Sequence, residues 1–148
     1  MSDLAPSLED PVARLRARGL RATGPRVAVL RAVGELEGHP DVETIAARAR
    51  SLAGSLSTQA VYDGLSALTR AGLIRRIEPA GSPARFEARV GDNHHHVVCR
   101  SCGAAEDVDC AVGHAPCLDP GDARGFLVDE AEVTFWGLCP ACRTGAAA

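Results

Sequence analysis

The stretch that organises this chain lies at residues 93–102 and reads Asn-His-His-His-Val-Val-Cys-Arg-Ser-Cys. It holds three of the 5 histidines and two of the 6 cysteines in a chain of 148 residues. Imidazole and thiol groups gathered so densely are typical of metal binding. Working outward from this stretch, the rest of the sequence can be searched for side chains that complete such sites.

Length and composition limit the classes of protein that need to be considered. The chain can bury one good hydrophobic core or two small ones. No apolar run approaches the length of about 18 residues that a membrane helix needs, and the acidic N-terminus lacks the apolar segment of a secretory signal. We therefore expect a cytoplasmic protein with no membrane partner. In that compartment, cysteines favour metal or redox chemistry over structural disulfides.

Charge is unevenly distributed along the chain. Residues 1–90 carry 13 Arg against 10 acidic residues, whereas residues 91–148 carry 3 Arg against 9 acidic residues. Residues 11–34 contain 6 Arg and no acidic residue. This pattern favours a polyanion such as DNA as the partner of the N-terminal half, although a solvated Arg-rich helix face would produce the same charges.

The N-terminal half contains residues that are typical of helix starts. Residues 1–9 read as a loose tail, and helices are expected over 12–18, 23–35, 41–52 and 57–72. Each is preceded by or begins with a residue suited to the N-cap position, namely Asp10, Thr23, Asp41 and Ser57. In the fourth helix, Val61, Leu65 and Leu68 would point inward at helical spacing. Its opposite face would carry Gln59, Tyr62, Asp63, Ser66 and Arg70.

Two short strands follow these helices. Residues 73–77 and 85–89 flank a turn rich in Pro and Gly, which predicts a β-hairpin. Helices followed by a hairpin are the order of a winged helix-turn-helix, in which the fourth helix would enter the major groove. The alternative is a small helical core that carries a hairpin with no role in DNA binding. We expect a DNA-binding domain at 1–89 and a second domain at 90–148.

The second domain is too small to hold itself together by apolar burial alone. Residues 95–99, 105–110, 126–129 and 132–138 read as strands, so the whole chain is predicted to be α/β (α+β). Its two Cys-x-x-Cys pairs, Cys99/Cys102 and Cys139/Cys142, can aim four thiolates at one structural Zn²⁺. A thioredoxin-like use of one pair lacks its βαβ context, and inert buried thiols are the remaining alternative. Dimerisation would stabilise the domain further.

Two other groups of residues predict a site less specifically than the Cys-x-x-Cys pairs do. Cys110 and Cys117 could form a redox disulfide or remain free thiols. On a strand, His94 and His96 point to one face about 6.6 Å apart, with His95 on the other, and Asp107 on the next strand can face the pair. Such ligands favour Fe(II), Mn(II), Zn or Ni over Cu(I). A solvated histidine loop is the alternative, and Glu87 could merely pair with Arg89.

Residues 94–103 resemble the HHHxxCxxCG signature of the ferric uptake regulator family. Residues 19–26 are similar to that family's G-x-R-x-T-x-Q-R opening, and residues 57–62 are similar to its recognition helix, so the resemblance spans nearly the whole chain. It implies a homodimeric repressor that binds palindromic double-stranded DNA. It also implies DNA contacts from residues of the opening and the recognition helix: Arg21, Arg26, Ser57, Thr58, Gln59, Tyr62 and Asp63.

The resemblance also implies a regulatory metal site for Fe²⁺ or Mn²⁺. By position, its ligands would be His39, Glu87, His94, His96 and Asp107, of which His39 could not be found from spacing. Peroxide-sensing members have Asp at the position of Asp107, where iron-responsive members usually have Glu. In those sensors, Fe(II) reacts with peroxide and a ligand imidazole is oxidised; the matching positions here are His39 and His94.

Several positions depart from the family pattern. Glu87 stands where peroxide sensors often have Asp. Pro25 and Asp63 replace the usual Gln and Arg in the DNA-binding segments. Asn93 and Ala131 replace histidines of a further metal site found in some relatives, which argues against that site here despite His95 and His114. Residues 59–63 and 108–113 are most similar to actinobacterial regulators of catalase-peroxidase genes.

We therefore expect a metal-dependent repressor that senses peroxide and controls catalase-peroxidase or other oxidative-stress genes. An iron-, zinc- or nickel-uptake regulator is the first alternative, and a thiol-based repressor that uses Cys110 and Cys117 is the second. An enzyme could also use such metal ligands. However, no separate nucleophile or nucleotide-binding loop is evident, and the basic half would have no role, so we expect no enzymatic activity.

Overall fold

The computed structural model of the protein describes residues 10–145, so the tail expected at residues 1–9 lies outside the described part. The chain forms two compact units. One comprises the chain up to Glu78 together with Pro83–Val90, and the other comprises Pro79–Ser82 together with the chain from Gly91 onward. Helices dominate the first unit and strands the second, so the predicted α/β (α+β) class is confirmed.

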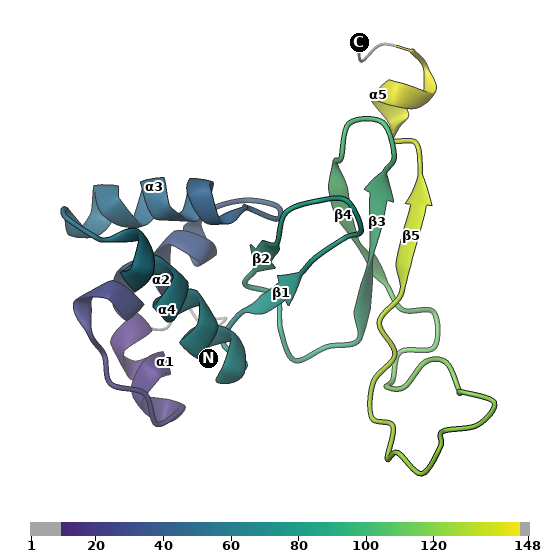
Figure 1. Ribbon diagram of the computed structural model, residues 1–148, viewed down its shortest axis with the longest axis horizontal. Helices are drawn as coiled ribbons and strands as arrows, with labels where there is room; N and C mark the ends of the chain where they lie inside the picture. Colours follow the sequence, from purple (N-terminus) through teal and green to yellow (C-terminus); the bar gives the residue numbers. More distant parts are fainter. Residues whose placement is uncertain (1–9, 146–148) are drawn as a thin grey trace, which may run out of the picture. The chain divides into compact units, whose positions relative to one another are not determined.

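The first unit begins with four helices (Figure 1), which are α1 (Pro11–Ala17), α2 (Gly24–Glu35), α3 (Val42–Ala53) and α4 (Thr58–Arg70). The four expected N-caps are all present. For example, the Asp41 carboxylate accepts a hydrogen bond from the Thr44 N–H at 2.9 Å, and the Ser57 hydroxyl accepts one from the Ala60 N–H at 3.1 Å. These bonds satisfy N–H groups that the helix itself leaves without partners, which fixes where each helix starts.

The core of this unit lies where the apolar faces of the helices meet. Val29, Ile45 and Leu68 are fully buried in it. Burial of each such side chain stabilises the fold by about 1.5–3 kcal/mol. Helices α2 and α4 approach closely at Gly64, where an added Cβ would lie 3.3 Å from Cγ2 of Val29.

The hairpin consists of β1 (Arg75–Ile77) and β2 (Arg85–Glu87), which pair antiparallel. Phe86 is buried in the helical core, and its N–H donates to the Pro40 carbonyl at 3.0 Å. The hairpin is therefore an integral part of a winged helix. Its first strand is shorter than predicted because Leu73 and Ile74 are buried in the helical core before the sheet begins.

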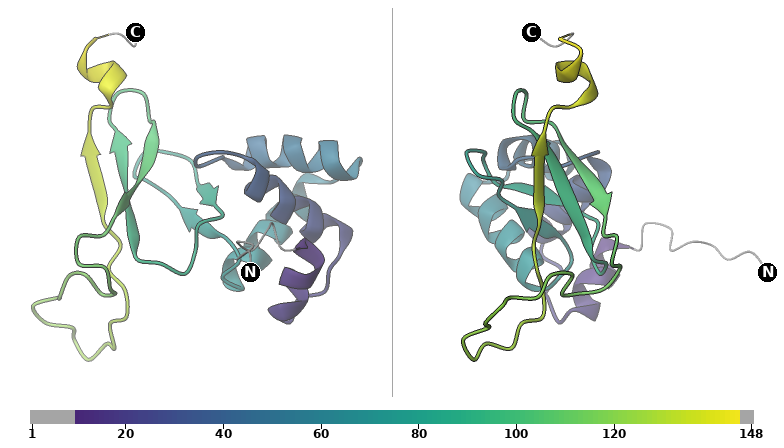
Figure 2. Two further views of the ribbon diagram at one scale, coloured as in Figure 1. Left: turned by 180° about the vertical axis from the view of Figure 1, so that it is seen from behind. Right: turned by 90° about the vertical axis from the view of Figure 1, so that its right-hand side faces the viewer.

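The second unit contains β3 (His94–Cys99), β4 (Ala105–Asp109), β5 (Thr134–Gly137) and the short α5 (Pro140–Arg143). Its strands form a three-stranded sheet with the order β4-β3-β5. Strands β3 and β4 pair antiparallel, and β3 and β5 pair parallel. Figure 2 shows residues 110–133 as a long segment at the end of this sheet opposite α5, which returns the chain for the parallel pairing.

The strand predicted at residues 126–129 is wrong. Phe126 and Leu127 have exposed fractions of 76% and 97%, and they belong to no strand of the sheet. A strand needs a neighbouring ladder as well as apolar residues, and the described part of this chain supplies none there. Separately, none of the helices within residues 10–145 has the length and apolar character required to cross a membrane.

Candidate metal centres and nucleic-acid interface

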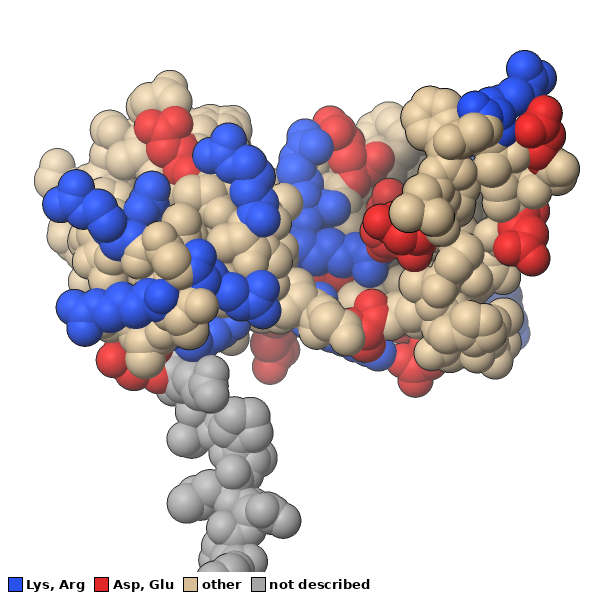
Figure 3. All heavy atoms as spheres, turned by 90° about the horizontal axis from the view of Figure 1, so that it is seen from below, with Lys and Arg blue, Asp and Glu red and all other residues tan. Residues whose placement is uncertain are grey.

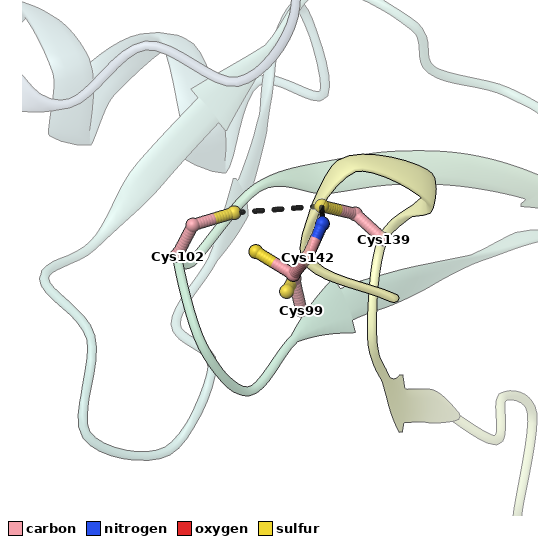
Figure 4. Close-up of side chains that lie close together, drawn as sticks. All are labelled: Cys99, Cys102, Cys139 and Cys142. Carbon is pink, nitrogen blue, oxygen red and sulfur yellow. Dashed lines mark hydrogen bonds between the residues drawn. The ribbon is translucent and has the colours of Figure 1, made fainter. Parts of the chain in front are cut away.

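The four cysteines of the two Cys-x-x-Cys pairs converge in the second unit (Figure 4). One ligand atom from each lies within 4.8 Å of the others, and Sγ of Cys102 lies 3.7 Å from Sγ of Cys139. Two sulfurs on one tetrahedral Zn²⁺ with bonds of about 2.3 Å would lie about 3.8 Å apart. The spacing is too long for a disulfide and fits a closed zinc site.

Local structure aims these thiols at one point. Cys99 ends β3, and a tight turn stabilised by the Gly103 N–H donating to the Cys99 carbonyl at 3.0 Å brings Cys102 back. Gly103 has φ +78°, a conformation that favours glycine. Cys139 is the N-cap of α5, where its sulfur accepts from the Cys142 N–H at 3.4 Å.

The thiols cannot all ionise easily without a cation. Backbone N–H groups of Cys102 and Cys139 lower the pKa of Cys99 to about 6. A hydrogen bond with Ser101 lowers the pKa of Cys142, but Cys139, burial and the two other cysteines outweigh it and raise that pKa to about 12. A divalent cation would remove this competition by stabilising all four thiolates. The donor set therefore fits Zn²⁺.

An imidazole–carboxylate cluster lies elsewhere in the same unit. His96 and Asp107 are directly paired across β3 and β4, and Oδ1 of Asp107 lies 3.3 Å from Nε2 of His96 and 3.6 Å from Nε2 of His94. Ligand atoms at right angles on one first-row ion, with bonds of 2.0–2.2 Å, would lie about 3 Å apart. The three side chains therefore fit a single borderline-hard ion after small shifts.

Asp92 completes this cluster and was not identified from the sequence. Its Oδ1 lies 2.7 Å from Nδ1 of His94. A carboxylate at this nitrogen holds the proton there and leaves Nε2, on the Asp107 side, with a free electron pair for a metal. The only signal in the sequence is the spacing of two residues between Asp92 and His94, which many loops share.

His39 and Glu87 lie together in the first unit. Nε2 of His39 is 2.9 Å from Oε2 of Glu87, and both side chains are almost fully buried. Oε1 of Glu87 also lies 4.0 Å from Nε of Arg75, its partner across the hairpin. A buried carboxylate is costly unless it is paired, and it offers a ready oxygen ligand next to an imidazole nitrogen.

The residues expected to contact DNA lie at the start of α2 and on the exposed face of α4. Arg21, Ser57, Thr58, Gln59, Tyr62 and Asp63 are exposed, and Arg26 is half-buried. Arg26 donates to the Arg21 carbonyl at 3.2 Å. In the view of Figure 3, Arg side chains dominate the charged surface of this unit. A groove of about 320 Å³ between α4 and the hairpin is lined by Tyr62, Arg70 and Arg76, among other residues.

Arg50 is a further residue of this surface that sequence reasoning missed. Its guanidinium donates to the Leu56 carbonyl at 2.9 Å and to the Thr58 hydroxyl at 3.2 Å. A cation is thereby held at the N-terminus of α4, where N–H groups already favour phosphate. The position of Arg50 late in α3 gave no sign of these contacts.

Cys110 and Cys117 lie close to His95, with one ligand atom from each of the three within 4.8 Å of the others. Backbone N–H groups of Gly113 and Val112 lower the pKa of the Cys110 thiol. Burial raises the pKa of the Cys117 thiol. Both cysteines are free thiols.

A winged helix together with thiolate and imidazole–carboxylate clusters defines a metal-dependent DNA-binding regulator. The chain belongs to the ferric uptake regulator family, whose sequence model matches residues 17–116. It is 60% identical over 136 residues to the transcriptional regulator FurA of Mycobacterium tuberculosis strain H37Rv, and the match covers 92% of each chain. Members of this family are dimeric DNA-binding transcriptional regulators rather than enzymes, as expected from the sequence.

The more distant relatives include a protein named for its response to peroxide. The chain is 27% identical over 141 residues to the peroxide-responsive repressor PerR of Staphylococcus epidermidis, which covers 92% of this chain and 90% of PerR. The structure of the Helicobacter pylori ferric uptake regulator superposes with a TM-score of 0.70 at 22% identity, covering 97% of each chain. The latter similarity confirms the fold.

Proposed function

We propose that this protein is a cytoplasmic repressor that senses peroxide through a regulatory Fe(II) or Mn(II) ion and controls oxidative-stress genes such as those of catalase-peroxidases. The observation that carries the proposal is the contact of Asp107 with His94 and His96. Asp at this position resembles the peroxide-sensing members. Fe(II), when bound, would supply a redox-active centre beside His39 and His94, whereas Mn(II) would not react with peroxide in the same way.

The regulatory ligands are divided between the two units in our proposal. His39 and Glu87 offer two donors from residues 1–89, which we assign to DNA binding. His94, His96 and Asp107 offer three from residues 90–148, which we assign to dimerisation. Neither set is a closed site, and five donors on one ion would leave a position open for peroxide. An ion that requires both sets would favour the arrangement of the units that suits a palindromic operator.

Structural Zn²⁺ at Cys99, Cys102, Cys139 and Cys142 is part of the same proposal. A closed site of four thiolates has no open position for peroxide, so it would hold the second unit together rather than sense the oxidant. Exposed apolar side chains on this unit, including Phe126 and Leu127, support burial in a homodimer.

A second candidate is an iron-uptake regulator. Glu87 and the identity to FurA favour it. The two candidates differ in whether oxidation, and not only metal loss, releases DNA. The test is to bind the zinc-loaded dimer to operator DNA with Fe(II) or Mn(II) under anaerobic conditions, and then to add a small excess of peroxide.

The peroxide sensor should lose the operator only in its Fe(II) form, and mass spectrometry should find added oxygen on the peptides that contain His39 or His94. Catalase added before peroxide is the control. Release of DNA that depends on free Fe(II) concentration alone, with both histidines unmodified, would favour the iron-uptake regulator. Release from the Mn(II) form that requires Cys110 and Cys117 would favour the thiol-based alternative.

A further inference from the structure

Strand β3 presents its three consecutive histidines to two faces. His94 and His96 both approach Asp107, whereas His95 approaches Cys117. This division follows from the alternation of side chains along a strand. The same strand can therefore serve a second cluster on its other face, separate from the His94/His96 set.

The second cluster is drawn from three parts of the unit. Nε2 of His95, in the middle of β3, lies 3.1 Å from Sγ of Cys117 in the segment 110–133. Cys110, which directly follows β4, supplies a second sulfur, and the ligand atoms of all three residues lie within 4.8 Å of one another. Sγ of Cys117 is also 4.0 Å from the Ala131 carbonyl, where the chain turns toward β5.

We propose that His95, Cys110 and Cys117 form a third metal site, which binds a thiophilic divalent cation of the Zn²⁺ class through one imidazole nitrogen and two thiolates. This site is independent of the proposed peroxide response. A nitrogen and a sulfur on one tetrahedral Zn²⁺ would lie about 3.5 Å apart, close to the observed spacing of His95 and Cys117. The two sulfurs separate this site chemically from the His/Asp cluster, since thiolates select softer cations.

The charges of the three ligands suit a partly buried position. Two thiolates and a neutral imidazole carry a charge that a divalent cation cancels, whereas ionised thiols without a cation would be costly to bury. His95 is 4% exposed, and its Nδ1 has no hydrogen-bond partner among residues 10–145. Its Nε2 contacts Sγ of Cys117, so the one nitrogen of this buried ring that has a partner faces another ligand of the proposed site.

The site would also give the segment 110–133 an anchor. This segment contains no helix or strand, yet it must return the chain so that β5 can pair with β3. The amide of Asn93 donates to the His114 carbonyl at 2.6 Å and so fixes the middle of the Cys110–Cys117 loop. A cation that joins β3, the end of β4 and this loop would anchor the ends of the Cys110–Cys117 loop to the sheet.

Co²⁺ is a suitable probe because thiolate ligands give it an intense near-ultraviolet charge-transfer band that nitrogen and oxygen ligands do not. The full-length dimer, with its four-cysteine site already loaded with zinc, would be titrated with Co²⁺ without oxygen and in the presence of a reductant. The zinc content would be measured in the same samples to exclude exchange. We expect the band to reach the amplitude of one thiolate-bound Co²⁺ per chain, because Co²⁺ bound at the His/Asp cluster adds no such band, and to be lost in Cys110→Ser and Cys117→Ser.

Two matched variants define the site. His114→Ala removes a histidine in the same loop that lies outside the cluster and should keep the band. His96→Ala disables the regulatory set and should also keep it, which separates failure of this inference from failure of the proposed function. Absence of the band in the wild-type protein with all thiols reduced would overturn the proposal even if a variant failed to fold. A band that persists in the Cys110→Ser/Cys117→Ser double variant, or a Cys110–Cys117 disulfide that resists the reductant, would overturn it too.

Discussion

The Gln59 side-chain amide donates a hydrogen bond to Oδ1 of Asp63 at 2.9 Å, one turn further along the exposed face of α4. The carboxylate is therefore held in place on the surface that we assign to the major groove. Next to phosphates it is repulsive, because two like charges about 4 Å apart in water repel by about 1 kcal/mol.

We predict that Asp63→Asn raises affinity for both operator and unrelated duplexes by about fivefold at low salt, and that the gain shrinks as salt increases. Fluorescence anisotropy at several salt concentrations measures this. Glu37→Gln removes an exposed acid outside α4 and is the control. If Asp63→Asn instead weakened operator binding selectively, the carboxylate would be reading a base, such as a cytosine amino group, and the repulsive role would be wrong.

Asp92→Asn tests the contact of Asp92 with His94. An amide at this position no longer favours the imidazole form that leaves Nε2 open, so affinity for the regulatory ion should fall by about 10- to 100-fold. Mn(II) binding followed by competition with a fluorescent chelator measures the change. Asp119→Asn, an exposed acid in the segment 110–133, should leave the affinity unchanged. Equal losses in the two variants would show a general charge effect.

Asp41 makes the stability of the helical unit depend on pH. Its hydrogen bond with the Thr44 backbone lowers its pKa from the ordinary value of 3.8. A lowered folded-state pKa contributes stability that is present above the unfolded pKa and is lost as pH falls through the folded pKa. Asp41→Ala should therefore cost about 1 kcal/mol at neutral pH and progressively less below about pH 4.

Urea unfolding followed by circular dichroism at helical wavelengths measures the effect of Asp41→Ala, because helices α1–α4 all belong to the first unit. Ser57→Ala removes an equivalent cap of α4 that does not titrate. Its cost should be independent of pH over the same range. A cost for Asp41→Ala that does not change with pH would mean that the hydrogen bond contributes without the charge.

Much of the first unit was predictable because its signals are local. Asp10, Thr23, Asp41 and Ser57 begin the helices as expected, since a cap depends only on the next few residues. The hairpin was predictable as an element, but its role was not. Whether Phe86 enters the helical core is decided by residues distant in sequence.

The candidate sites were likewise predictable only where their signals are local in the sequence. The two Cys-x-x-Cys pairs are recognisable because their spacing already forms half of a closed site. His39 had no such signal and was named only from the family resemblance. Asp92 and Arg50 contact His94 and Thr58, to which we assign metal and DNA binding, and these contacts arise only in the folded chain. The strand predicted at residues 126–129 was wrong because apolar β-forming residues do not reveal whether a neighbouring strand exists.

Cys99→Ser and His94→Ala should separate a structural metal from a regulatory one. Cys99 is 5% exposed and joins β3 to the four-cysteine cluster. Structural Zn²⁺ contributes about 10–16 kcal/mol of apparent binding free energy at pH 7, which matches or exceeds the stability of a typical domain. Cys99→Ser should therefore lose zinc and unfold the second unit, while His94→Ala should keep both zinc and sheet.

Trp136 reports on this difference, because it lies on β5 opposite Val98 and its ring is 5.5 Å from the Arg100 guanidinium. In Cys99→Ser its fluorescence should shift to the red, with the helical circular dichroism of the first unit largely retained. In His94→Ala the emission should match the wild type, but added Mn(II) should no longer increase affinity for the operator. Equal loss of zinc and of Trp136 burial in both variants would contradict the division, because His94 would then be needed for the fold itself.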